Sequence, residues 1–144
     1  KNDVNEADAK VVIEVRVPAQ VDDAAGKTEA STVLEKEDTV AIYGSNEFAA
    51  KAIINANGGF KESKLGADKI LAVGFDSGAL QQDAIRKGIF VGSVTQDPVQ
   101  IGYQAVKLAV AAAKGETVKD VDTGSKWYDA KNIDSEEIKA LLYE

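Results

Sequence analysis

The sequence contains no cysteine, no histidine and no methionine among its 144 residues. Without these side chains the chain has no thiol nucleophile, no imidazole general base and no histidine or cysteine ligand for zinc. The absence of cysteine is compatible with any redox compartment. No apolar run approaches the roughly 18 residues that suggest a membrane-spanning helix. These absences argue against an enzyme of the common hydrolase or zinc-dependent classes.

Basic side chains are also fewer than acidic ones. The chain has 17 Lys and Arg residues against 24 Asp and Glu residues, which gives a net charge of −7. Proteins that bind nucleic acids gain most of their affinity from basic groups that neutralise phosphates. The charge balance therefore argues against a nucleic acid partner. The length fits one domain, and 44% apolar residues is ordinary for a globular fold.

Short apolar runs alternate with segments of helical pattern along the first two thirds of the sequence. The runs are continuous and too short for amphipathic helices, which is typical of strands buried in a parallel sheet. Such strands are connected by right-handed crossovers. The alternation predicts an α/β fold with a doubly wound parallel sheet, with strands at 11–17, 40–44, 70–75 and 89–95 and helices at 24–35, 48–56 and 79–87.

The last third of the sequence has a different pattern. Asp97 and Pro98 predict the start of a helix that extends to about residue 114 and is apolar nearly all round. A helix of this kind needs burial on more than one side. A short strand at 124–128 and a last helix, which begins near Ser135 and extends through Leu142, are also expected.

Polar residues follow each predicted strand. They are Gln20 with Asp22, then Asn46, Asp76 and Gln96. Each has a purely structural interpretation: Asn46 as a helix cap, Asp76 in an Asx turn, and Gln96 in a solvated loop. In open α/β sheets, however, ligands bind at the carboxyl ends of the strands. Because all these residues are predicted to meet at that edge, we expect a binding site there.

Several short motifs lie along the sequence: YGSNE at 43–47, VGFD at 73–76, TQDP at 95–98, IGY at 101–103, DTG at 122–124 and KNID at 131–134. In this order and spacing they resemble those of the type I periplasmic sugar-binding proteins, and of the ribose-binding branch in particular. The resemblance extends over about residues 10 to 144 and implies the C-terminal half of such a protein, without its N-terminal lobe.

The resemblance implies a division of the chain into three parts. Residues 1–97 would form the C-terminal ligand-binding lobe, incomplete at its start because the strand and most of the helix that open this lobe are missing. Residues 98–118 would contain a helix that packs on the missing N-terminal lobe. Residues 119–144 would supply the strand that returns through the hinge and the C-terminal helix. In this family the ligand is enclosed between two lobes by hinge closure.

The resemblance also implies roles for individual residues. Asn46 and Asp76 would form hydrogen bonds with sugar hydroxyls, and Gln96 would do the same at the hinge crossing. A carboxylate suits a polyol because it can accept from two hydroxyls at once. Val21 falls where ribose binders often have an aromatic wall, and this departure removes a stacking face. The ligand site is therefore predicted to comprise Val21, Asn46, Asp76 and Gln96.

Two functions remain open at this stage. The first is a sugar-binding subunit of an ABC transporter, which has no catalytic activity, cofactor or metal and contacts a permease. The second is the effector-binding domain of a transcription regulator of the lactose-repressor type, which shares the fold and the strand-end motifs. The closing DTG and NID segments favour the transport function. That function implies a periplasmic or extracellular protein, either free or anchored as a lipoprotein.

Overall fold

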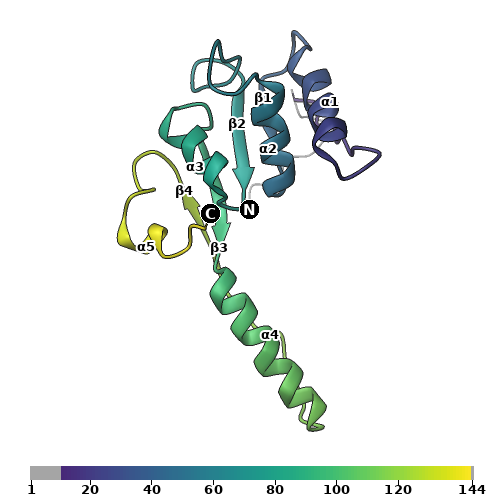
Figure 1. Cartoon of the computed structure of the whole chain (residues 1–144), viewed down its shortest axis with the longest axis vertical. Coiled ribbons are helices and arrows are strands. Elements are labelled where there is room, and N and C mark those ends of the chain that lie inside the picture. Colours follow the sequence, from purple (N-terminus) through teal and green to yellow (C-terminus); the bar gives the residue numbers. More distant parts are fainter. Residues whose placement is uncertain (1–10, 144) are drawn as a thin grey trace.

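The computed structural model describes residues 11–143 and contains one four-stranded sheet (Figure 1). The strands follow one another across the sheet in chain order: β1 (Ala41–Tyr43), β2 (Leu71–Phe75), β3 (Gly92–Gln96) and β4 (Ser125–Tyr128). The first three are parallel and β4 is antiparallel to β3. The predicted α/β fold is confirmed, and the sheet is mostly rather than wholly parallel.

Three helices connect or precede the parallel strands, and they match the predicted ones within one residue at either end. They are α1 (Asp23–Leu34), α2 (Glu47–Ala56) and α3 (Ala79–Arg86). Helix α1 begins where Asp22 accepts a hydrogen bond from the Ala25 N–H at 2.8 Å. Such caps satisfy main-chain N–H groups that have no partner within the helix. This is why local sequence predicts the helix starts well.

The hydrophobic core lies between the sheet and these helices. Helix α2 packs on β1 and β2, with α1 and α3 at its sides (Figure 1). The two faces of the sheet differ, since Ala72 is fully buried whereas its neighbour Leu71 is 41% exposed. Each large apolar side chain that is fully buried contributes about 1.5–3 kcal/mol. The larger members of the core are Leu34, Ile53, Ile54, Leu65, Ile85, Ile89, Phe90, Tyr128, Ile133 and Ile138.

The predicted strand at residues 11–17 is wrong. This segment is extended but belongs to no strand, and its valines are exposed, Val12 to 92%. The pairing of β1 leaves its outer edge free. The Gly44 N–H donates to Val73 O at 2.9 Å, and the Leu71 N–H donates to Val40 O at 3.0 Å, so the two positions that flank β1 face β2. Alternate positions in β1 then face outward, where the described residues supply no strand.

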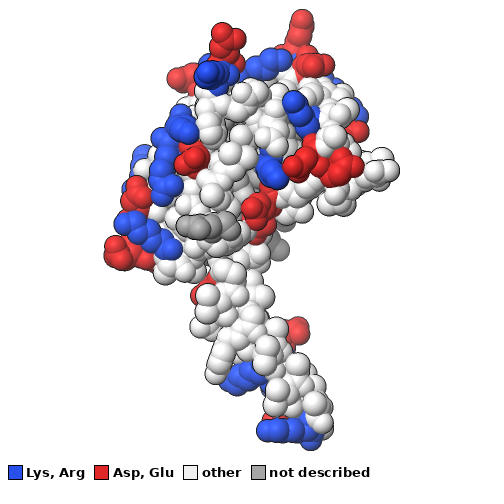
Figure 2. Space-filling model, in the orientation of Figure 1, with Lys and Arg blue, Asp and Glu red and all other residues white. Residues whose placement is uncertain are grey.

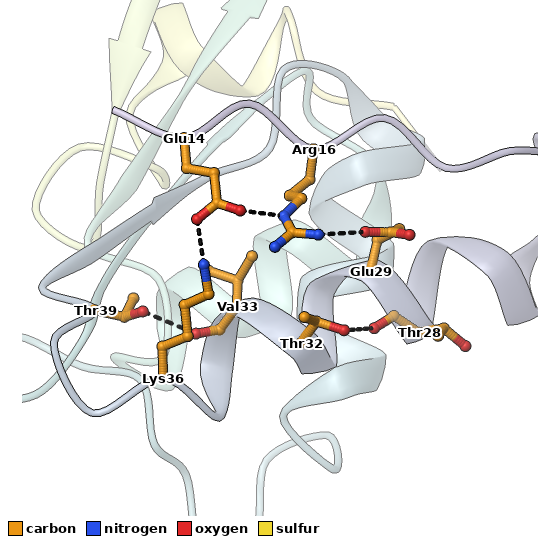
Figure 3. Close-up of polar contacts among 8 residues, drawn as sticks. All are labelled: Glu14, Arg16, Thr28, Glu29, Thr32, Val33, Lys36 and Thr39. Carbon is orange, nitrogen blue, oxygen red and sulfur yellow. Dashed lines mark hydrogen bonds and ion pairs between the residues drawn. The ribbon is translucent and has the colours of Figure 1, made fainter. Parts of the chain in front are cut away.

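Side-chain ion pairs, rather than main-chain bonds, connect residues 11–17 to the rest of the fold (Figure 3). Glu14 pairs with Arg16 and with Lys36, and Arg16 lies 3.7 Å from Glu29 of α1. The Lys36 hydrogen bond lowers the pKa of Glu14. Exposed ion pairs of this kind contribute little to stability. Residues 11–17 therefore form no strand despite their β-branched sequence, although the outer edge of β1 is free.

Helix α4 (Pro98–Ala113) projects away from the body of the protein (Figure 1). None of its residues is buried, and Val99 and Val106 are 71% and 67% exposed. Figure 2 shows the helix as mostly white, that is, free of charged side chains along most of its length. The helix is thus exposed in this chain, and its packing on an N-terminal lobe remains a prediction. No helix within residues 11–143 combines the length and apolarity needed to cross a membrane.

The last helix is shorter than predicted. Helix α5 covers only Glu136–Lys139 and is capped by Ser135, whose hydroxyl accepts from the Ile138 N–H at 3.4 Å. Beyond it, the Leu141 carbonyl accepts from Ser77 Oγ at 3.1 Å, and the Tyr143 carbonyl accepts from the Gln82 side chain at 2.9 Å. These long-range bonds hold the tail against the strand ends in a non-helical conformation, which local sequence does not indicate.

The difference between core and α4 can be tested with two truncations to alanine. We expect Ile54→Ala in α2 to lower the free energy of unfolding by about 2–5 kcal/mol, because it leaves a cavity in the core. Val106→Ala in α4 should change it by less than about 0.5 kcal/mol, because that side chain is exposed. Urea denaturation followed by circular dichroism measures both. A loss above about 2 kcal/mol for Val106→Ala would show that α4 is packed against something in solution.

Candidate functional site

The structure brings Asn46 and Asp76 together at the carboxyl ends of β1 and β2, through the first turn of α2. Asn46 is the N-cap of this helix, and its Oδ1 accepts from the Ala49 N–H at 2.9 Å. Asp76 Oδ2 accepts from the Glu47 N–H at 3.0 Å. Both side chains thus satisfy free N–H groups at the positive end of the helix dipole. The cap role considered for Asn46 is confirmed.

Both side chains keep polar groups for a ligand. An ionised carboxylate offers about four acceptor positions; one bond to Glu47 leaves Asp76 able to accept from further donors. The amide nitrogen of Asn46 has no hydrogen-bond partner among residues 11–143, and Asn46 is exposed to solvent. One carboxylate and one amide, side by side at the end of a helix, can therefore both accept from and donate to the hydroxyl groups of a small molecule.

The main chain of Asp76 has an uncommon conformation. Its φ is +75°, in the left-handed region that residues other than glycine seldom adopt. The carbonyl oxygen of Asp76 accepts from Ser93 Oγ at 2.9 Å, from Tyr128 OH at 2.9 Å and from Gln81 Nε2 at 3.3 Å. All three donors are buried. Burial raises the pKa of Tyr128 to about 12, so its hydroxyl keeps the proton that it donates.

The C-terminal tail forms one rim of this site. The Tyr143 hydroxyl donates to Glu47 Oε2 at 3.2 Å, although the two residues are 96 positions apart. Burial raises the pKa of Tyr143, and the carboxylates of Asp76 and Glu47 add to the shift. Sequence reasoning did not place Glu47 and Tyr143 together. Neither residue stands out locally, and only the folded path of the tail makes them neighbours.

Gln96 ends β3 and lies on the same edge of the sheet. Its main chain pairs with Ser125 of β4, and the residue lines a small hollow of about 220 Å³ with Thr123 and Leu141 among others. No hydrogen bond joins Gln96 to Asn46 or Asp76 within the described part of the chain. The structure therefore places Gln96 on the predicted edge without linking it to the other two residues.

Val21 lies just before the N-cap of α1. Its side chain is 85% exposed, so in this structure it forms no packed wall for a ligand. The residue precedes Asp22 in the loop that follows the unpaired segment 11–17. The role predicted for Val21 remains a prediction.

A larger hollow lies elsewhere, between residues 14–18, helices α1 and α2, and β1. Its volume is about 360 Å³, and its lining is mostly apolar, including Val15, Val33, Ile42 and Ile53. It contains none of the predicted ligand residues. The candidate site is instead an open surface at the edge of the sheet. In residues 11–143 there is no group of three or more acidic side chains that could hold a metal ion.

A comparison with protein families identifies most of the chain. Residues 2–117 match the model of the periplasmic binding protein domain. No curated protein matches significantly. This match covers the extended segment, the three parallel strands, helices α1 to α3 and the projecting helix α4.

Solved structures with the same fold come from bacterial transport proteins. One, described as "ABC transporter, LacI family transcriptional regulator" from Brachyspira murdochii, is 44% identical with a TM-score of 0.75, over 88% of this chain and 42% of that one. An ABC transporter solute-binding protein from Agrobacterium vitis with bound D-fucose is 28% identical with a TM-score of 0.79, over 95% of this chain and 47% of that one.

A third structure is that of a carbohydrate transporter solute-binding protein from Agrobacterium radiobacter in complex with D-arabinose. It is 29% identical with a TM-score of 0.72, over 84% of this chain and 40% of that one. The chain thus spans less than half the length of each of these three proteins. Its fold is that of one lobe of a periplasmic binding protein.

The left-handed turn at Asp76 can be tested by comparing two substitutions that both remove the carboxylate. Asp76→Ala should be less stable than Asp76→Gly by about 1 kcal/mol, because glycine adopts a positive φ without steric cost. Denaturant unfolding measures the difference. Ser45, whose φ is not positive, is the control position, and there alanine should be at least as stable as glycine. Equal stability of the two Asp76 variants would contradict the assigned conformation.

Proposed function

The chain belongs to the periplasmic binding protein domain family, and on that basis we propose that it forms one lobe of a solute-binding protein that delivers a sugar to an ABC transporter. Proteins of this family bind ligands and do not catalyse reactions. The proposed lobe accordingly uses no cofactor or metal. It contributes hydrogen-bonding groups to one side of a cleft.

The pairing of Asn46 and Asp76 is the observation that supports this function most directly. Sugar hydroxyls both donate and accept hydrogen bonds. The site offers the carboxylate of Asp76 and the amide of Asn46 at the N-terminus of α2. Hydrogen bonds to a charged group are stronger than neutral ones. In the proposed complex Asp76 accepts from two hydroxyls, Asn46 donates from its amide, and Gln96 contacts the same ligand near the hinge. Val21 adds an apolar contact in place of an aromatic wall.

The class of ligand is supported by the relatives. Two of the similar structures contain bound D-fucose and D-arabinose, and another contains α-D-tagatopyranose. All are small neutral polyols. We propose a ligand of this class, with the identity of the sugar set by residues on both sides of the cleft.

A second lobe completes the proposed site. The site residues lie on an open edge of the sheet rather than in an enclosed cavity, and α4 exposes apolar side chains along its length. Both features fit a lobe whose N-terminal counterpart, on the same or a second chain, covers the ligand and packs on α4. The assembled protein would act in the periplasm or outside the cell, free or lipid-anchored, and would dock on the transporter permease.

A second candidate function is the sensing of an effector by a transcription regulator. It is favoured by one observation: the description of the 44% identical protein names both an ABC transporter and a LacI family regulator. The two functions share this lobe and differ outside it. A helix-turn-helix in the longer protein, with operator binding that responds to a sugar, would identify the regulator.

The proposed function predicts a dependence of affinity on the second lobe. By thermal shift and calorimetry with D-fucose, D-arabinose and D-tagatose, the isolated chain should show no saturable binding below about 1 mM, because one lobe supplies only one side of the cleft. The protein with both lobes should bind one such sugar, and Asp76→Ala should weaken that affinity about 10- to 100-fold.

Asp83→Ala provides the control for this experiment. Asp83 is an exposed carboxylate on α3, and it forms an ion pair with Lys87 at 3.9 Å. Its removal should leave sugar affinity unchanged. Micromolar binding by the isolated chain would show that the second lobe is not required, and full affinity in Asp76→Ala would show that the ligand does not bind at this edge.

A further inference from the structure

We propose that Tyr128, Ser93 and Gln81 are positioning residues that hold the main chain of Asp76 in its left-handed turn and thereby set the direction of its carboxylate. The effect on ligand affinity rests on the proposed function. The effect on the geometry of Asp76 does not, and it can be measured without a ligand.

The conformation of Asp76 needs support from its surroundings. A residue with a side chain at φ +75° is strained relative to an extended one, and such strain persists only where neighbouring groups determine the conformation. The Asp76 N–H is held by Val94 O of β3 at 2.7 Å. Its carbonyl points away from that bond, into the interior. Fixing the N–H and the carbonyl together fixes the direction in which the Asp76 side chain leaves the main chain.

The carbonyl is held by three side chains from three different elements. Tyr128 comes from β4, Ser93 from β3 and Gln81 from α3, and each is at most 1% exposed. Gln81 Nε2 also donates to the Phe75 carbonyl at 2.9 Å and lies 3.4 Å from Ser93 Oγ. Buried polar groups are costly without partners. These buried donors therefore form one connected group whose common acceptor is the main chain at the end of β2.

The carboxylate position follows from this arrangement. In a regular strand the side chain of Asp76 would lie on the face of Ala72 and Gly74, which is buried. The left-handed turn takes it to the sheet edge instead, where Oδ2 reaches the Glu47 N–H at 3.0 Å. Without the carbonyl bonds, relief of strain would favour a negative φ and would withdraw the carboxylate from Glu47.

Tyr128 also connects this residue to a distant part of the chain. It lies 52 positions after Asp76, on the strand that returns after α4. Its hydroxyl reaches the Asp76 carbonyl only when β4 pairs with β3, where Tyr128 lies opposite Ser93. The geometry of the site residue thus depends on a strand that lies far from it in the sequence.

The test is hydrogen exchange at the Glu47 amide in Tyr128→Phe. This amide lies in the first turn of α2, where N–H groups have no partner within the helix, so its protection depends on the Asp76 carboxylate. We expect protection at Glu47 to fall at least fivefold, while protection of the core amide of Ile54 falls by less. Tyr103→Phe, in an exposed tyrosine of α4, should change neither amide.

Ser93→Ala provides a second variant if Tyr128→Phe does not fold, and it should give the same selective loss at Glu47. A loss at Glu47 no larger than that at Ile54 in the folded variant would overturn the proposal, because it would reflect global stability alone.

A ligand-binding measurement gives a separate readout in the two-lobe protein. Tyr128→Phe should weaken sugar affinity in the wild-type background but not in Asp76→Ala, since it acts through Asp76. Equal weakening in both backgrounds would contradict the positioning role. Absence of sugar binding in the wild-type protein would count against the proposed function, while the exchange result at Glu47 would still decide the positioning of Asp76.

Discussion

Parallel pairing of β1, β2 and β3 is the constraint on which the rest of the structure depends. Register places Ala41 beside Leu71 and Val73 beside Gly92, so the three strands end at one edge. Asn46 and Asp76 become neighbours for this reason, although they are separated in the chain by a helix and a long loop. The first turn of α2 then joins them, because its free N–H groups require acceptors.

Apolar side chains and an unpaired strand edge are exposed on the remaining surface of the described chain. Helix α4 carries one charged residue, Lys107, and no buried one, and β1 presents an outer edge that no strand covers within residues 11–143. A single-domain protein of this size would bury such surfaces in its own core. The chain spans less than half the length of each of the three similar solved structures, which is consistent with a lobe that meets further polypeptide along α4.

Stability and binding make different demands on the same side chains. Asn46 caps α2, and Asp76 accepts from its first N–H, so both contribute to folding before any ligand is bound. Their remaining lone pairs and donors face solvent at the sheet edge. Substitutions at these positions therefore change stability as well as affinity. Variants that keep the helix cap at Asn46 or the left-handed turn at Asp76 separate the two effects. The buried side chains that donate to the Asp76 carbonyl contribute to stability and to the geometry of the site in the same way.

Local sequence by itself determined helices α1 to α4 and the four strands of the sheet. Asp22, Asn46 and Asp97 cap helices through bonds to residues three positions along, and such signals need no distant partner. It also located the strand-end residues, because ligands in open α/β sheets bind at the carboxyl ends of strands. The sugar-binding role of those residues remains a prediction.

Tertiary structure alone decided the rest. Residues 11–17 have strong β propensity but form no strand, because β propensity depends on context and the main chain of this segment does not pair with the free edge of β1. The last helix ends at Lys139 because distant side chains bind the carbonyls of the tail. The left-handed turn of Asp76 arises in the same way. Its donors come from α3, β3 and β4, and only folding brings them to one carbonyl oxygen.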